Sequence, residues 1–258
     1  MIKLERTAQV WCICGNLGGG KTLTAVSMAV DGIRNGYYVV SNVTLSLPEL
    51  CKSIPYADKL YSHIQVRNEE YDDNGNLLKR EDFNPFTIPS GSPRGSGGNK
   101  RVLVILDECA EWFDQYQNAR TPIFQRVTSW LRHTSKRSQD VVFIVQRREF
   151  LHKQFRSLVS RWIFVEDLAT WRIPVLHVRV PFCDHLCMAN VFDKVNQRVQ
   201  PTTFIPKPFF GKFYNTAECL SSFGGESAEY EIPRRDSRFP FFLYLLWISS
   251  AFALFLLI

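Results

Sequence analysis

The sequence lacks the features of an exported protein. Its first ten residues, MIKLERTAQV, contain no apolar core of a signal peptide, so nothing predicts export of the front of the chain. The seven cysteines are an odd number without a paired secretory spacing, which favours a reducing compartment over a disulfide framework. The group Cys183 to Cys187 lacks the C-x2-C spacing and has no second pair nearby, so ordinary thiols are favoured over a zinc site.

Internal repeats and a dominant charge are also missing. No repeated unit is visible, which argues against a solenoid or array. The net charge of +6 permits contact with nucleic acid or anionic lipid but does not require either. With 258 residues, the chain is long enough to bury a full core in one large domain, or in one domain with an appendage.

One long uncharged apolar run is present, FPFFLYLLWISSAFALFLLI, at the C-terminal end of the sequence. About 20 apolar residues are enough for a helix to cross a bilayer, so residues 239–258 are predicted to form a transmembrane helix, with a very hydrophobic core helix as the alternative. Arg234, Arg235 and Arg238 precede the run, and positive flanks favour the cytoplasmic side. We therefore expect a cytoplasmic domain over residues 1–200, an extended linker over 201–238 and one membrane pass.

The stretch CGNLGGGKTLTAV contains the pattern G-x4-G-K-[ST], placed after an apolar strand pattern (8–14) and before a helical pattern (21–36). Glycines allow backbone N–H groups to turn toward a phosphate, and the helix N-terminus adds a partial positive charge. The alternative is a glycine-rich turn that happens to precede a lysine. The residues expected to bind ATP are Gly15, Asn16, Leu17, Gly18, Gly19, Gly20, Lys21, Thr22 and Leu23.

The pattern also predicts catalytic roles. Lys21 is expected to reach the β- and γ-phosphates, and Thr22 to offer its hydroxyl to Mg²⁺. The strand RVLVILDE ends in two acids, of which Asp107 is expected to hold Mg²⁺ and Glu108 to orient or deprotonate the attacking water. Gln146, at the end of the next strand, is a candidate sensor of the γ-phosphate. A helix cap at the acids and a polar strand terminus at Gln146 are the alternatives.

The order of strand and helix patterns predicts an α/β fold, a P-loop NTPase with a mostly parallel sheet flanked by helices. Residues 67–100 are polar, contain an Asn-Gly turn signal and end in a Gly/Ser/Pro-rich stretch, so they are expected to form an insertion or mobile loop. Further strands are expected over 37–43, 101–108, 140–146, 161–167 and 171–180, and further helices over 121–140 and 148–160.

The segment LDECAEWF followed by WLRHTSKRSQDVVFIVQ resembles the assembly and export ATPases of filamentous phages, in the zonular occludens toxin-like family of P-loop proteins. The resemblance extends over residues 8–167. The matching positions are Asp107, Glu108, Trp112, Phe113, His133, Asp140 and Gln146.

The resemblance implies a cytosolic motor domain, anchored in the host inner membrane, that drives assembly and extrusion of a single-stranded DNA phage. Its implied partners are the phage coat protein and single-stranded DNA or its nucleoprotein complex. The family often continues beyond the membrane helix into a periplasmic part, whereas this sequence stops at Ile258. Contact with an outer-membrane exit channel is implied only through such a part.

P-loop motors commonly act as homo-oligomers in which one subunit supplies an arginine to its neighbour's site. The candidates are Arg132 and Arg137, in the basic turn after the predicted helix, with a solvated surface turn as the alternative for each.

Two other functions compete with export. One is genome packaging by an ATPase of the same superfamily, against which stand the Trp112-Phe113 pair and the C-terminal apolar run. The other is a membrane-tethered toxin or interaction protein with a degenerate P-loop, against which the intact Lys21 and Glu108 argue.

Overall fold

The computed structural model describes residues 2–5, 7–65, 67–71, 77–82, 84–91, 101–109, 120–171 and 183–214. Trp112, Phe113, residues 172–180 of a predicted strand and the predicted membrane helix 239–258 lie outside these ranges. None of the helices within the ranges has the length and apolar character needed to span a membrane.

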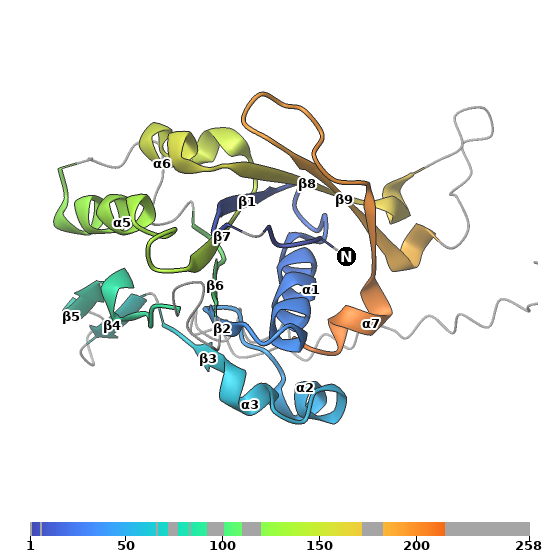
Figure 1. The fold of residues 1–258 in the computed structure, drawn as a ribbon, viewed down its shortest axis with the longest axis horizontal. Coiled ribbons are helices and arrows are strands. Elements are labelled where there is room, and N and C mark those ends of the chain that lie inside the picture. The colour runs from blue at the N-terminus through green and yellow to red at the C-terminus, as the bar shows by residue number, and fades with distance from the viewer. Residues whose placement is uncertain are drawn as a thin grey trace, which may run out of the picture. The chain divides into compact units, whose positions relative to one another are not determined.

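The core of the fold is an eight-stranded sheet in the order β10-β9-β8-β1-β7-β6-β2-β3 (Figure 1). Its strands are β1 (Val10–Cys14), β2 (Tyr38–Ser41), β3 (Tyr61–His63), β6 (Val102–Leu106), β7 (Gln139–Val145), β8 (Arg161–Asp167), β9 (Leu186–Phe192) and β10 (Thr203–Pro206). The strands from β8 through β3 run parallel, whereas β9 is antiparallel to β8 and β10 to β9. The predicted α/β fold with a mostly parallel sheet is confirmed.

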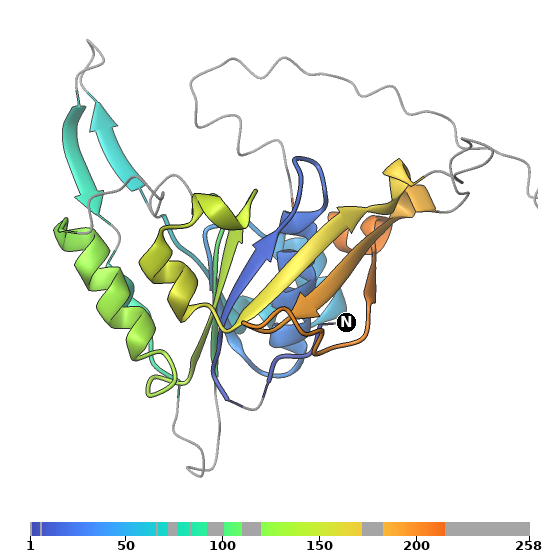
Figure 2. The same ribbon diagram turned by 90° about the horizontal axis from the view of Figure 1, so that it is seen from above.

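Helices cover both faces of the sheet (Figure 2). They are α1 (Lys21–Arg34), α2 (Leu47–Ser53), α3 (Ala57–Leu60), α5 (Pro122–Arg132), α6 (Lys153–Leu158) and α7 (Lys207–Gly211). Because successive side chains of a strand point to opposite faces, Trp11 and Ile13 of β1 join the core cluster of α1, and Cys12 joins that of α5 and α6. Every residue of β1 is buried, as expected for a parallel strand covered on both faces.

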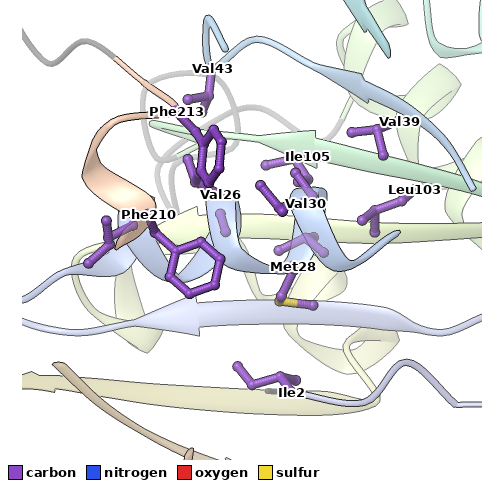
Figure 3. Close-up of a cluster of buried hydrophobic side chains, with 14 of the residues drawn as sticks. Ile2, Val26, Met28, Val30, Val39, Val43, Leu103, Ile105, Phe210 and Phe213 are labelled. Carbon is purple, nitrogen blue, oxygen red and sulfur yellow. The ribbon is translucent and has the colours of Figure 1, made fainter. Parts of the chain in front are cut away.

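The first helix, α1, begins directly after the glycine-rich loop and packs against the sheet. Gly20 precedes it in a left-handed conformation (φ 89°), and Gly36 follows it in another (φ 77°). Figure 3 shows Val26, Met28 and Val30 within a cluster that also contains Phe210 and Phe213. The segment around α7 is thus part of the packing of α1.

Residues 67–100, expected to form an insertion or mobile loop, contain regular structure in their described part. Within residues 67–100, β4 (Arg67–Tyr71) and β5 (Leu77–Asp82) form an antiparallel pair, and a 3-10 turn follows at Pro85–Thr87. Antiparallel strands satisfy each other's backbone hydrogen bonds, so a polar segment can form them without an apolar period. The Asn-Gly signal lies between the two strands in the sequence and outside the described residues.

The linker was predicted to start at residue 201, which is too early, because folded elements follow that residue. Residues 203–206 form β10, which pairs with β9, and α7 follows immediately. Prolines at 201, 206 and 208 argued against a strand in the sequence. They are compatible with β10 because it is an edge strand, and proline is tolerated at the ends and edges of sheets. The compact unit therefore extends beyond residue 200, to about Thr216.

Asp140 lies at the amino end of β7, away from the glycine-rich loop, with a fully buried side chain. Its carboxylate accepts hydrogen bonds from the backbone N–H of Gln9, at 2.9 Å, and from the guanidinium of Arg101. Burial raises the pKa of Asp140 to about 6, although Arg101 and the N–H of Gln9 oppose that rise. Asp140 therefore joins the start of β7 to the residues that precede β1 and β6, at the ends of the strands opposite the loop.

We expect Asp140 to make the free energy of unfolding depend on pH. Its pKa of about 6 in the folded protein exceeds the unfolded value of about 3.9, so its stabilising contribution is complete below the unfolded value and is lost as the pH rises through about 6. Compared with Asp140→Asn, the wild-type chain should lose about 2 kcal/mol between pH 4 and pH 7. Urea unfolding across this range checks the prediction, and a constant difference between the two proteins would contradict it.

Candidate nucleotide-binding site

The glycine-rich loop connects the carboxyl end of β1 to the amino end of α1. The N–H of Gly15 donates to the carbonyl of Gln146 at 3.2 Å, and the N–H of Gly19 donates to the carbonyl of Asn16 at 3.0 Å. The Lys21 ammonium donates to the same Asn16 carbonyl at 2.9 Å. Gly18 and Gly20 have positive φ angles of 70° and 89°. The loop thus has the backbone turns that a phosphate cradle requires.

Two glycines of the loop are required by packing. A Cβ atom at Gly15 would lie 2.5 Å from the carbonyl oxygen of Val165 in β8. A Cβ atom at Gly20 would lie 2.3 Å from Sγ of Cys187 at the start of β9. The loop therefore rests directly on β8 and β9, and no larger residue fits at either position without a shift.

Asp107 meets the loop from the end of β6. The hydroxyl of Thr22 donates to Oδ2 of Asp107 at 2.7 Å, although β7 lies between β1 and β6 in the sheet. Asn42, directly after β2, fixes the backbone of Asp107: its Oδ1 accepts from the Asp107 N–H at 2.7 Å, and its amide donates to the Asp107 carbonyl at 3.1 Å. The two residues predicted to bind Mg²⁺ are thus in contact.

Burial dominates the electrostatics of the charged pair at the loop. Burial raises the pKa of Asp107, while the Thr22 hydroxyl, the N–H of Glu108 and the Lys21 ammonium oppose that rise. Burial lowers the pKa of Lys21, and the charge of Asp107 opposes that change. Both groups lose hydration through burial, and a bound polyanion and cation would supply compensating charges.

Most of the predicted site residues line one cavity of about 710 Å³. The predicted residues that line it are Leu17, Gly18, Gly19, Gly20, Lys21, Thr22, Leu23, Asp107, Glu108 and Gln146. Gly15 and Asn16 shape the loop through the backbone contacts given above. Glu108 has a positive φ of 56°, uncommon for a residue with a side chain, and its N–H donates to Oδ1 of Asp107 at 2.8 Å.

The structure does not bring the candidate arginines to this cavity. Arg132 ends α5 and is exposed, and Arg137 lies in the turn before β7, whose other end meets the loop. The Arg137 guanidinium donates to the carbonyl of Ile88 at 2.7 Å and to that of Phe86 at 3.4 Å. Within its own chain, Arg137 therefore binds residues 86–88, near the amino end of β7 and away from the glycine-rich loop.

Three polar residues near the loop were not found from the sequence. Asn42 follows a predicted strand, and its place at a strand end was the available signal. Asp167 also ends a predicted strand, and that place was again the available signal. Lys207 lies in the segment that was expected to be a linker, so no signal indicated its place in the cavity wall.

A strand, a G-x4-G-K-[ST] loop and a helix, with an acid from another strand bonded to the loop threonine, define a P-loop protein. The family model "Zonular occludens toxin (Zot)" matches residues 10–215, which is most of the chain. The chain belongs to the zonular occludens toxin family.

Curated relatives include two phage proteins, each described as "Gene 1 protein". The one from Enterobacteria phage I2-2 is 29% identical over 177 residues, covering 65% of this chain and 42% of its own length. The one from Enterobacteria phage M13 is 27% identical over 157 residues, covering 60% and 40%. The chain thus spans well under half the length of these relatives.

Two solved structures resemble the fold at low identity. The N-terminal domain of zonular occludens toxin from Neisseria meningitidis has a TM-score of 0.45 and 17% identity, covering 81% of this chain and 100% of that one. The genome packaging NTPase B204 from Sulfolobus turreted icosahedral virus 2, in complex with ATP-gammaS, has a TM-score of 0.41 and 12% identity, covering 76% and 96%. Membership of the family rests on the sequence match.

The seat of the loop on Cys187 predicts different effects of alanine at two of its glycines. Gly18 and Gly20 both have positive φ, but a Cβ atom at Gly18 meets nothing within 4 Å. Gly18→Ala should cost about 1 kcal/mol of unfolding free energy, from backbone strain alone. Gly20→Ala should cost about 1–3 kcal/mol more, because the added methyl group overlaps the thiol.

Urea unfolding of both variants measures the two costs, and binding of a fluorescent ATP analogue should fall further in Gly20→Ala. Equal losses of stability in the two variants would show that the loop does not rest on β9 as described.

Proposed function

We propose that this chain is the ATPase motor of filamentous phage assembly, which extrudes single-stranded DNA phage through the host inner membrane. The observation that carries the proposal is the Thr22–Asp107 hydrogen bond, within a chain that belongs to the zonular occludens toxin family. It joins the phosphate loop to a strand-end carboxylate, as a nucleotide with a bound cation requires. Phage relatives that share the matched region support the assignment to phage assembly.

The residues around the loop fit ATP and Mg²⁺ chemically. A hydroxyl and a carboxylate are the hard oxygen ligands that Mg²⁺ prefers, and Thr22 and Asp107 supply them side by side. The N–H groups at the start of α1 and the Lys21 ammonium fit a polyphosphate. When bound, Mg²⁺ would neutralise charge that develops on the transferred phosphoryl group.

The chain's own residues would then have separate tasks. Lys21 would leave the Asn16 carbonyl and bind the terminal phosphates. Glu108, in the cavity wall beside Asp107, would accept a proton from the attacking water. Gln146, whose carbonyl holds the N–H of Gly15, would report the state of the γ-phosphate to β7.

Anchorage and assembly complete the proposal. Residues 239–258 would cross the inner membrane once, with Arg234, Arg235 and Arg238 on the cytoplasmic side together with the ATPase domain. A homo-oligomer would gather coat protein and single-stranded DNA, or its nucleoprotein complex, at the inner face. Arg137 of one subunit would reach another subunit's site only after leaving the carbonyls of Ile88 and Phe86, whereas Arg132 is exposed.

Hydrolysis of ATP should require Lys21 and Glu108 in different ways. Lys21→Ala should weaken ATP binding, because the ammonium that meets the phosphates is lost. Glu108→Gln should keep binding and lower the hydrolysis rate by about 100-fold or more, because a general base is lost. Phosphate release with Mg²⁺ and binding of a fluorescent ATP analogue measure both.

Glu49→Gln is the matched control, because Glu49 is a partly exposed glutamate that pairs with Lys52 on α2 and does not line the cavity. It should hydrolyse ATP at the parental rate. Parental hydrolysis by Glu108→Gln would show that Glu108 is not the base.

Extrusion should fail when hydrolysis fails. In cells that replicate the phage genome with Glu108→Gln in this gene, we expect few released virions, while single-stranded DNA and coat protein accumulate inside. Titres and DNA in the medium and in the cells measure this, with Glu49→Gln as the control. Release of particles that lack DNA would instead favour genome packaging.

A further inference from the structure

The cavity continues past the phosphate loop to a wall that phosphate and metal binding do not use. This wall contains Asp167 at the end of β8, Cys187 at the start of β9, Lys207 in α7, and Tyr214. Asp167 and Cys187 come from the strands on one side of β1, and Lys207 from the helix that follows β10. The wall therefore lies in the part of the cavity where the remainder of a ligand bound by its phosphates would be.

The strand order gives a bound nucleotide a direction. From β1, the sheet runs through β7 to β6 on one side, where Gln146 and Asp107 end the strands, and through β8 to β9 and β10 on the other. A terminal phosphate near Asp107 and Glu108 lies on the β6 side of the loop. The nucleoside end then extends toward β8 and α7.

Asp167 is held in place by two donors on a single oxygen. The Lys207 ammonium donates to Oδ1 at 2.5 Å, and the N–H of Ala169 donates to the same oxygen at 2.8 Å. Oδ2 has no hydrogen-bond partner among the residues that the structure describes. With side chains 20% and 28% exposed, Asp167 and Lys207 are fixed but reachable from the cavity. The carboxylate thus offers one oriented acceptor.

Lys207 is fixed relative to the phosphate-binding helix. Phe210 and Phe213, just after it, are buried in the cluster of α1 (Figure 3). The carbonyl of Phe213 accepts from the N–H of Ser46 at 2.8 Å, which ties the end of this segment to the chain after β2. The ion pair and the loop therefore keep a constant separation.

The separation suits a nucleotide. Val165, on which Gly15 rests, is two residues before Asp167 in β8, a distance of about 7 Å along a strand. Asp167 is thus close enough to the loop to contact the part of a nucleotide that adjoins its phosphates. A carboxylate is a standard acceptor for ribose hydroxyls in nucleotide sites.

We propose that Asp167 binds the ribose of the nucleotide, with Oδ2 accepting a hydrogen bond from a ribose hydroxyl while Lys207 holds the carboxylate. The proposal rests on nucleotide binding at the loop, as proposed above. It makes the end of β8, with α7, the part of the protein that distinguishes a ribonucleotide from a bare polyphosphate.

Calorimetric titration of the full chain with ATP, 2′,3′-dideoxy-ATP and tripolyphosphate, each with Mg²⁺, tests the proposal. The wild-type chain should bind dideoxy-ATP about tenfold more weakly than ATP, the loss expected for one hydrogen bond to a charged group. Asp167→Ser should bind ATP about tenfold more weakly, and bind tripolyphosphate and dideoxy-ATP like the wild type. Serine can still accept from the N–H of Ala169 but lacks the second oxygen.

Asp193→Ser is the matched control. Asp193 also accepts backbone N–H bonds, from Val195 at 2.9 Å and Gln197 at 2.8 Å, in the turn between β9 and β10. This variant should bind all three ligands like the wild type.

The outcomes separate the two proposals. Equal wild-type affinity for ATP and dideoxy-ATP overturns the ribose assignment and leaves nucleotide binding intact. An equal loss of ATP and tripolyphosphate affinity in Asp167→Ser also overturns it, because the variant then acts on the phosphates. Wild-type protein that binds neither ATP nor tripolyphosphate overturns the proposed function together with the ribose assignment.

Discussion

The hydrogen bond between Thr22 and Asp107 is the contact on which the site depends. It crosses the end of β7, so it forms only if β1, β7 and β6 lie in that order and end at the same edge of the sheet. Asn42 fixes the backbone of Asp107 from β2, which extends the constraint over a fourth strand. The parallel half of the sheet is therefore required as a unit to place two side chains 2.7 Å apart. A disturbance in any of these strands would be felt at the phosphate loop.

The strands on the other side of β1, β8 and β9, constrain the same loop. Gly15 and Gly20 approach Val165 and Cys187 so closely that side chains are excluded at both glycines. Close packing of this kind has low compressibility, so a movement of the loop must be accompanied by a movement of β8 or β9. In a motor, that coupling would carry a change at the phosphates into β9, β10 and α7. The loop is thus packed against one strand that the sequence pattern predicted, β8, and one that it did not, β9.

The residues shared with the family pattern do not all serve the site. Asp107, Glu108 and Gln146 line the cavity, whereas Asp140 is buried at the opposite edge of the sheet with Arg101. A buried acid with an arginine and a backbone N–H as partners fixes strand positions, and its loss leaves unpaired polar groups. Asp140 therefore holds strands in register, while other residues on which the resemblance is based line the cavity.

The sequence by itself determined the loop, the helix after it, the buried strands and the acid pair. Each has a local cause: glycines for positive φ, a helical apolar period for the helix, continuous apolar runs for the buried strands, and polar residues where a strand ends. Only the tertiary structure decided that Asn42 binds Asp107, 65 residues away, and that Lys207 binds Asp167, 40 residues away. It also placed Arg137 at the far edge of the sheet. Such contacts depend on strand order and on packing between distant segments, and neither leaves a periodic signal in a single sequence.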